Sequence, residues 1–413
     1  MTGRASAPQE KTVRRRRVFY IPGYDPIHPR RYRELYRSES AAQAKISDYR
    51  VTLSPKAKGA GRYGWHVETE IGGRVTSADV EVLVWSDIVR GSMGQSIPAT
   101  YAQLLLTAWA YIGSGALFRL MRLRKGPMIA ALYPIVLLIL QAVLGSVLGC
   151  GVAALALSAL PEFPGAGLLG MALAVAVLAL VLDRFRRWDH RLYAYYLMHD
   201  YAYSAQARGA NPPALEARMA EFGTTIATAL TEDWDEVLVV GHSSGAHLGV
   251  SILADLLRAN RVPDGATLAF LSLGQVVPMV SFLPKAQRLR ADLRDLSAQD
   301  RIAWVDVTAP GDGCAFALCD PVAVSGVAPE GKRWPLVISA AFTQTLSPER
   351  WAELRWRFFR LHFQYLCAFD RPADYDYFQI TAGPQTLAAR YAGRPPSKSR
   401  IERAENRYTD CAP

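Results

Sequence analysis

Two long stretches without charged residues constrain the fold of this chain more than any other feature. No Asp, Glu, Lys or Arg occurs between Lys125 and Glu162, and none occurs between Glu162 and Asp183. As a helix, residues 165–182 would be roughly 27 Å long at about 1.5 Å per residue, close to the ~30 Å thickness of a bilayer's hydrocarbon core. We therefore predict a transmembrane helical hairpin over residues 126–183.

Basic residues flank both outer ends of the predicted hairpin. They are Arg119, Arg122, Arg124 and Lys125 before it and Arg184, Arg186, Arg187 and Arg191 after it. The connecting turn at residues 161–165 contains Glu162 and no Lys or Arg. Because Lys and Arg are retained in the cytoplasm, both ends of the hairpin, and the soluble parts that they join, are expected there. The predicted location is a bacterial inner (cytoplasmic) membrane.

The whole chain is basic, with 47 Lys and Arg against 37 Asp and Glu, which favours negatively charged partners. Because two basic clusters flank the uncharged stretches, membrane lipids are expected partners and nucleic acid is not. Five dispersed cysteines without a C-x-x-C pair argue against a disulfide framework or a zinc site. Since no nucleotide-binding loop or metalloprotease motif occurs either, no cofactor and no metal ion are predicted.

A third uncharged stretch, residues 99–118, is less apolar because it contains Gln103, Thr107 and Ser114. If the soluble parts on either side of the insertion share one sheet, the chain must cross the membrane an even number of times. We therefore predict an amphipathic helix at the membrane surface, with a basic linker, over residues 99–125. Entry of residues 99–118 into the membrane is the alternative.

A short glycine-flanked motif, Gly-His-Ser-Ser-Gly, occupies residues 241–245. An apolar run typical of a strand precedes it, and a helical pattern follows it, which is the setting of a nucleophile elbow. Gly241 and Gly245 stand where side chains would collide between strand and helix. Ser243 is therefore the candidate nucleophile, although a tight turn without chemistry would show the same local pattern.

Patterns typical of strands and helices alternate through the soluble parts. Strands are predicted at residues 18–21, 50–53, 65–71, 80–85, 237–240, 267–273 and 302–308, and helices at residues 30–46, from 212 onward, 246–258 and 348–365. Such alternation predicts a mostly parallel sheet flanked by helices.

With a glycine loop after its first strand and the serine turn, the chain resembles the α/β-hydrolase family, in particular bacterial membrane-inserted serine hydrolases of the lipase or esterase type. The resemblance covers residues 17–98 and 190–390 and implies an α/β-hydrolase-like sheet with an inserted transmembrane hairpin. Because almost nothing precedes Val18, the first two strands of the family's sheet are expected to be missing. The predicted parts are a basic disordered arm (1–17), the first half of the α/β domain (18–98), the interfacial helix and linker (99–125), the hairpin (126–183), the second half with the elbow (184–390) and a polar tail (391–413).

A serine nucleophile needs a neighbouring base that is oriented by a carboxylate. In the family the chain order is Ser, then Asp or Glu, then His. Only His247 and His362 follow Ser243, and His247 lies within the predicted elbow helix, where packing is expected. His362 is therefore the candidate base, and a histidine packed on an amphipathic helix is the alternative.

Asp312 is the first choice for the acid. It lies in the turn after the strand predicted at residues 302–308, where the family places its triad acid. Asp306, inside that strand, and Asp320 fall in the same interval and stay open as alternatives. A glycine-flanked aspartate can also serve only as a turn former.

Two backbone N–H groups are needed to bind the oxyanion of a tetrahedral intermediate. The candidates are Ser244 on one side and Gly23 or Tyr24, in the loop after the first strand, on the other. That loop continues into a cationic segment, residues 28–31, which is interpreted either as a rim for an anionic substrate group or as a solvated surface.

These residues together predict a membrane-anchored serine hydrolase that cleaves carboxylic esters or thioesters through an acyl-enzyme. Anchoring favours lipid-like substrates, because it raises their concentration near the site. A small ester is also compatible, and acyl transfer to an acceptor other than water would use the same residues. The alternative from another class is a non-catalytic membrane protein that keeps the hydrolase fold as a binding or assembly module.

Overall fold

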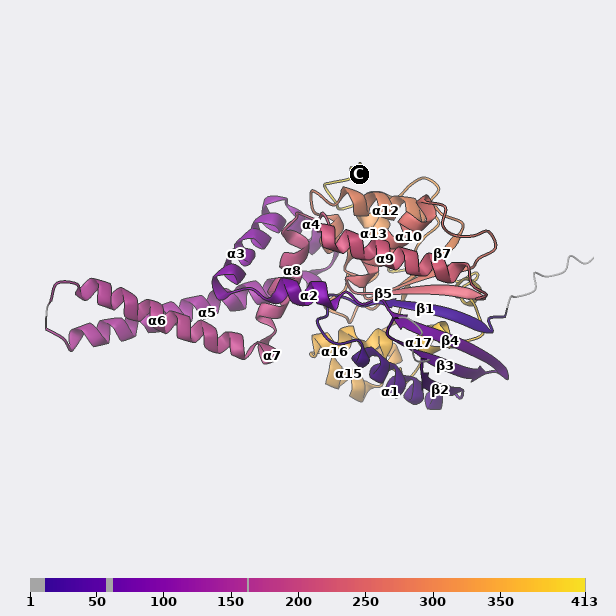
Figure 1. Ribbon diagram of the computed structural model, residues 1–413, viewed down its shortest axis with the longest axis horizontal. Coiled ribbons are helices and arrows are strands. Elements are labelled where there is room, and N and C mark those ends of the chain that lie inside the picture. The colour runs from indigo at the N-terminus through magenta and orange to yellow at the C-terminus, as the bar shows by residue number, and fades with distance from the viewer. Residues whose placement is uncertain (1–11, 57–61, 162, 413) are drawn as a thin grey trace, which may run out of the picture.

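The computed structural model describes residues 12–56, 62–161 and 163–412. Within these residues eight strands form one sheet, in the order β2-β3-β4-β1-β5-β6-β7-β8. The strands are β1 (Arg15–Ile21), β2 (Arg50–Pro55), β3 (Gly64–Ile71), β4 (Arg74–Val82), β5 (Glu236–His242), β6 (Leu268–Leu273), β7 (Ile302–Thr308) and β8 (Leu336–Ser339). Helices cover both faces of the sheet, and a long helical hairpin projects from one end (Figure 1).

The sheet is mostly parallel, as predicted. Strand β1 pairs in parallel with β4 and β5, and β5 to β8 continue in parallel. Among the described strands, the antiparallel pairs are β2–β3 and β3–β4. Every residue of β5 and β7 is buried, which explains why both strands were visible as apolar runs. Strand β8 was not predicted, because its four residues are too few to show a pattern.

Two predicted boundaries differ from the structure. The strand predicted at residues 80–85 lies earlier, at Arg74–Val82, because its polar first half pairs with β3. Within the described residues no strand precedes β1, and the edge beyond β4 is formed by β3 and β2, which were both predicted and follow β1 in the chain. The predicted disordered arm ends too late, since Arg16 lies in β1 with its Nε 2.7 Å from the Glu236 carboxylate, both side chains fully buried.

The helices that flank the sheet and link its strands vary widely in length. They are α1 (Arg30–Ile46), α2 (Ser86–Met93), α3 (Ile97–Ala108), η1 (Trp109–Gly113), α4 (Ala116–Leu123), α5 (Lys125–Ser158), α6 (Ala166–Arg187), α7 (Asp189–Leu192), α8 (Ala194–Ala205), α9 (Pro213–Leu230), α10 (Gly245–Arg258), α11 (Val277–Ser281), α12 (Gln287–Ser297), α13 (Pro321–Val324), α14 (Phe342–Thr345), α15 (Pro348–Leu354), α16 (Phe358–His362), η2 (Gln364–Leu366), α17 (Tyr377–Ala382) and α18 (Leu387–Arg390). The single helix predicted at residues 348–365 is therefore broken into α15, α16 and η2.

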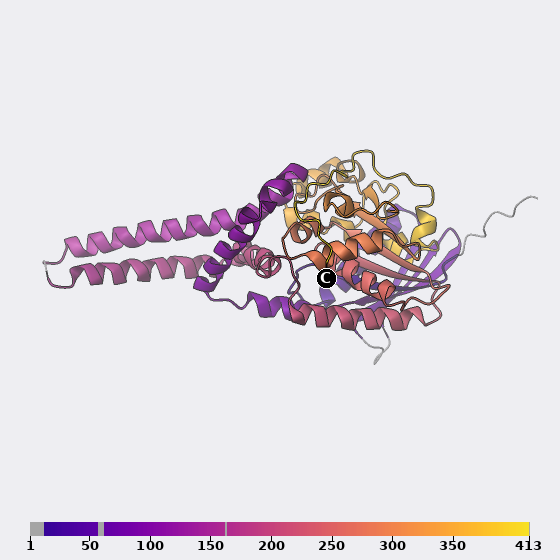
Figure 2. The same cartoon turned by 90° about the horizontal axis from the view of Figure 1, so that it is seen from above.

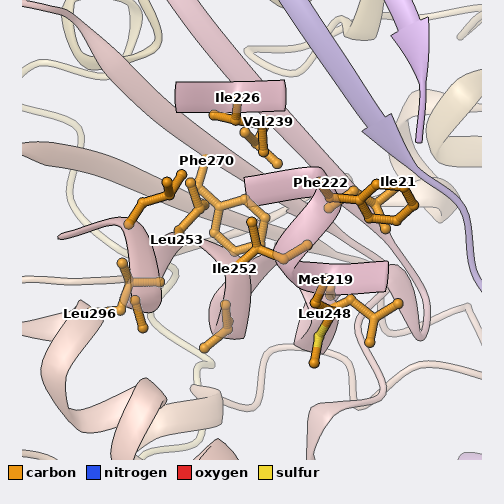
Figure 3. Packing of buried hydrophobic residues seen from close by; sticks show 14 of the residues in the cluster. Ile21, Met219, Phe222, Ile226, Val239, Leu248, Ile252, Leu253, Phe270 and Leu296 are labelled. Carbon is orange, nitrogen blue, oxygen red and sulfur yellow. The ribbon is translucent and has the colours of Figure 1, made fainter. Parts of the chain in front are cut away.

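Helices α9 and α10 pack on one face of the sheet through a continuous apolar core (Figure 3). Phe270 of β6 and Val239 of β5 lie beneath them, fully buried. The helices contribute Met219, Phe222, Ile226, Leu248, Ile252 and Leu253. Each such burial stabilises the fold by roughly 1.5–3 kcal/mol. This packing holds the start of α10 firmly at the end of β5, which is where Ser243 lies.

The projecting hairpin consists of α5 and α6, whose most apolar windows have mean hydropathy 2.4 and 2.3. Only 22% of the α5 window and 11% of the α6 window are buried inside the protein. Most of their apolar side chains therefore face outward. The two helices approach closely: a Cβ added at Gly149 would lie 2.5 Å from the Ala174 carbonyl oxygen. Both helices are long and apolar enough to cross a membrane, which agrees with the predicted hairpin.

The third uncharged stretch forms α3, the π-helical turn η1 and α4 at the base of the hairpin (Figure 2). The chain bends by 72° between Ile97–Gly113 and Ala116–Leu123. These helices would make a third membrane span only if the bent pair is counted as a single span. Leu105, Leu106 and Trp109 are exposed on this segment. Its position at a membrane surface stays a prediction.

The C-terminal segment, predicted as a polar tail, packs along the sheet domain. Ile401 forms an isolated bridge with Cys319, and Arg290 lies 2.8 Å from the Asp410 carboxylate. Because these contacts are made by backbone and by ion pairs, its composition alone gave no sign of them.

Candidate active site

The predicted site residues meet at one edge of the sheet. Ser243 follows β5, Gly23 follows β1 and Asp312 follows β7, and the carboxyl ends of parallel strands lie on the same side of a sheet. His362 is the last residue of α16, which comes after β8. A cavity of about 90 Å³ at this edge is lined by Gly23, Tyr24, Ser243, Ser244 and His362.

Ser243 occupies a strained turn. Its φ is +57°, in the left-handed region that costs a non-glycine residue of order 1–3 kcal/mol. A Cβ at Gly241 would lie 2.6 Å from the Gly245 carbonyl oxygen, and one at Gly245 would lie 2.1 Å from the Ile21 carbonyl oxygen. Side chains at either position would therefore push strand and helix apart, as expected from the sequence.

His362 and Asp312 form a buried pair. The Nδ1 atom of His362 lies 2.7 Å from Oδ2 of Asp312. Oδ2 also accepts a hydrogen bond from the Tyr365 hydroxyl at 3.0 Å, and Oδ1 accepts one from the Cys314 N–H at 2.9 Å. With Nδ1 donating to Asp312, Nε2 of His362 is left as an acceptor for a proton.

The partners of Asp312 determine its charge. Burial by itself would raise the pKa of this carboxyl, but the neighbouring His362 and the three hydrogen bonds outweigh burial, and the pKa is lowered. His242 is a further buried neighbour and donates from Nε2 to the His362 carbonyl oxygen at 3.0 Å. Burial, with a contribution from His362, lowers the pKa of His242 to about 3, so its ring is neutral.

The loop after β1 comes very close to the serine. A Cβ at Gly23 would lie 3.3 Å from Ser243 Oγ. Among the described residues, the N–H groups of Gly23, Tyr24 and Ser244 donate to no protein acceptor. These donors border the same cavity, and they can therefore bind a negative oxygen that forms beside Ser243.

Ser243 and His362 line the same cavity but share no hydrogen bond within the described residues. Catalytic hydrogen bonds of this kind are often long before substrate binds.

The alternative acids, Asp306 and Asp320, have other partners, and His247 is packed within α10 as predicted. Asp306 accepts a hydrogen bond from Ser272 within the sheet, and Asp320 caps α13 and contacts Lys332. Neither contacts His362, so Asp312 is the acid that the structure pairs with it. His247 is buried in α10, burial lowers its pKa to about 4, and its Nδ1 has no partner in the described part of the chain.

Part of the cavity lining comes from the hairpin and from helices that precede and follow it in the chain. Pro127 of α5, Tyr111 of η1 and Tyr196 and Asp200 of α8 all line the cavity. The start of the hairpin also touches the loop that carries the acid, since a Cβ at Gly126 would lie 3.3 Å from the Cα of Gly313. No local motif marks these residues, so the sequence did not point to them.

Asp200 is the most informative of these residues. No hydrogen bond reaches its carboxylate within the described residues. Burial raises the pKa of Asp200 to about 7, although His362 acts in the opposite direction. Besides Asp25, the cavity is therefore lined by a carboxyl group that is largely neutral below that pH.

Asp312, Cys314 and His362 also offer three potential metal-ligand atoms within 4.8 Å of one another. Burial raises the pKa of the Cys314 thiol well above its ordinary value, so the thiol is neutral. Oδ2 of Asp312 already accepts hydrogen bonds from Nδ1 of His362 and from Tyr365, and its Oδ1 accepts one from the Cys314 N–H. The arrangement fits a histidine–carboxylate pair better than a metal centre.

Comparison of the chain with protein-family models, with curated proteins and with solved structures found no match. The interpretation of the site therefore depends on its own geometry.

Proposed function

We propose that this protein is a membrane-anchored serine hydrolase with an α/β-hydrolase fold, which cleaves carboxylic esters or thioesters through an acyl-enzyme. One observation carries the proposal. A serine held at φ +57° borders the same small cavity as a histidine whose Nδ1 lies 2.7 Å from a buried carboxylate. In that fold the triad follows the chain order serine, aspartate, histidine, as Ser243, Asp312 and His362 do.

In the proposed reaction, Ser243 Oγ attacks the acyl carbon while Nε2 of His362 takes the hydroxyl proton. Asp312 stabilises the imidazolium that forms. The negative oxygen of the tetrahedral intermediate accepts hydrogen bonds from the Ser244 N–H and from the Gly23 or Tyr24 N–H. Loss of one such donor costs roughly 3–4 kcal/mol in serine hydrolases. His362 then gives its proton to the leaving alcohol or thiol, and water repeats the sequence to release the acid.

The same proposal includes α5 and α6 as transmembrane helices of a bacterial inner membrane, with the sheet domain in the cytoplasm. Its support is the basic last turn of α6, with Arg184, Arg186 and Arg187, against a turn without Lys or Arg. A cysteine introduced by Phe163→Cys should react with an impermeant maleimide from the periplasmic side. Reaction only from the cytoplasmic side would reverse the orientation.

A fluorophosphonate probe applied to membranes tests the enzyme assignment directly. The parent protein should be labelled, Ser243→Ala should lose the label, and Ser399→Ala, an exposed serine in the C-terminal segment, should keep it. An unlabelled parent, or a label that persists in Ser243→Ala, would favour the non-catalytic binding module instead.

A further inference from the structure

The cavity beside Ser243 is small. Its volume is about 90 Å³, and Val276, Met279 and Val280 close it on one side. An engineered apolar cavity of about 150 Å³ holds one benzene molecule, which has six carbon atoms. The space beside Ser243 is therefore large enough for a short acyl group and too small for a fatty acyl chain.

A much larger groove adjoins this cavity. It has a volume of about 1110 Å³ and lies between α1 on one side and α15 and α16 on the other. Asp25, Tyr196, Phe359 and Phe363 line both spaces, so the groove leads directly to the cavity. A substrate could thus place one part in each space at the same time.

Aromatic rings line the junction between the two spaces. The Phe359 ring centroid lies 5.9 Å from that of Tyr196 and 5.0 Å from that of Tyr193. On the groove side of this junction the walls are charged. Their ionic residues include Arg31, Arg37, Arg350, Arg360, Glu34 and Glu353. Because a buried alkyl chain would leave these charges desolvated, the groove suits a polar molecule.

Arg31 is the cation of the groove that has the weakest acidic partner. Arg37 lies 2.9 Å from Glu34, and Arg360 lies 3.2 Å from Glu353. Arg31 instead lies 3.9 Å from Asp25, with its guanidinium 5.0 Å from the Phe363 ring centroid. Phe363 lines both spaces, so this cation stands at the junction between groove and cavity.

We infer that the substrate is a short acyl ester or thioester, with about two to four acyl carbons by comparison with the benzene cavity, of a large polar carrier that bears an anionic group. The acyl group occupies the cavity, the carrier occupies the groove, and Arg31 binds a carboxylate or phosphate on the carrier. This inference rests on the proposed function, and it replaces the expected lipid-like acyl chain. The hairpin then holds the enzyme near the carrier and does not itself receive the acyl chain.

The first test is a series of p-nitrophenyl esters with 2, 4, 8 and 12 acyl carbons, hydrolysed by the full-length protein in detergent. We expect kcat/KM for the two short esters to exceed that for the two long ones at least tenfold. Met279→Ala, which enlarges the cavity, should shift the preference toward the eight-carbon ester. A parent protein that reacts with the fluorophosphonate probe and prefers the long esters would overturn this inference alone, whereas an unlabelled, inactive parent would overturn the proposed function.

The second test concerns the carrier. 4-Carboxyphenyl acetate and 4-acetoxyphenyl phosphate carry the two kinds of anion, and p-nitrophenyl acetate is the neutral reference. In Arg31→Ala the ratio of kcat/KM for the preferred anionic acetate to that for the neutral one should fall about tenfold. Arg30→Ala, an exposed neighbour outside the groove, should keep the ratio within twofold. An unchanged ratio in Arg31→Ala for both anions would contradict the role of Arg31.

Discussion

Two histidine–aspartate pairs in this molecule have the same contact distance and very different surroundings. Nδ1 lies 2.7 Å from the carboxylate both in His362–Asp312 and in His66–Asp79. The first pair is almost fully buried, with side chains 9% and 0% exposed, while the second, on β3 and β4, is 35% and 26% exposed. Only the first borders the cavity beside Ser243. A short contact between histidine and carboxylate therefore does not define a site by itself.

The surroundings of Asp312 also set its carboxyl apart from another buried carboxyl, that of Asp306. It receives hydrogen bonds from Tyr365 and from the Cys314 N–H as well as from His362, and its pKa is lowered in spite of burial. Asp306 of β7 is equally buried but has Ser272 as its side-chain partner, and burial raises its pKa to about 8. The neighbouring imidazole and the hydrogen bonds that reach Asp312 therefore lower its pKa, whereas burial raises the pKa of Asp306.

The largest expected effect is on kcat, and it distinguishes the two histidine–aspartate pairs. His362→Ala should lower kcat for short esters by about 10³- to 10⁴-fold, because the general base is removed. His66→Ala, which removes a histidine from a pair of equal length, should keep kcat within twofold. Steady-state kinetics with p-nitrophenyl acetate measures both. An equal loss of kcat in the two variants would mean that both substitutions act by destabilising the fold. Undiminished hydrolysis by His362→Ala would exclude His362 as the base.

A smaller effect on kcat is expected from Tyr365, whose hydroxyl also donates to Asp312 of the buried pair. Tyr365→Phe removes the hydroxyl that donates to Asp312 at 3.0 Å, and a hydrogen bond to a charged group contributes roughly 1.5–3 kcal/mol. We expect kcat to fall about tenfold with KM within twofold, since Tyr365 positions Asp312 and does not touch substrate. Tyr36→Phe, whose hydroxyl bonds to Thr381, is the matched control. A change in KM alone would place Tyr365 in substrate binding.

Much of the sheet could be predicted from sequence because its central strands are buried on both faces. Strand β7 was predicted with its observed bounds and β6 within one residue, and α1 was predicted with its observed bounds. The edge was harder: the polar first half of β4 becomes a strand only by pairing with β3. Its partner strand is close in the chain, joined through Gly72 and Gly73, but the polar side chains of this half of β4 form no apolar run that would mark it as a strand.

The sequence by itself determined the outward-facing apolar hairpin and the turn at Ser243, because a run without charges and a strand–glycine–serine–helix order are local properties. Through the expected chain order, the sequence also limited the candidates for the base and the acid to a few residues. Only the tertiary structure brought His362 to Asp312 rather than leaving Asp306 or Asp320 as its partner. Only the tertiary structure placed α8, with Asp200, over the serine, because contacts between residues far apart in the chain depend on how the whole sheet and its insertion pack.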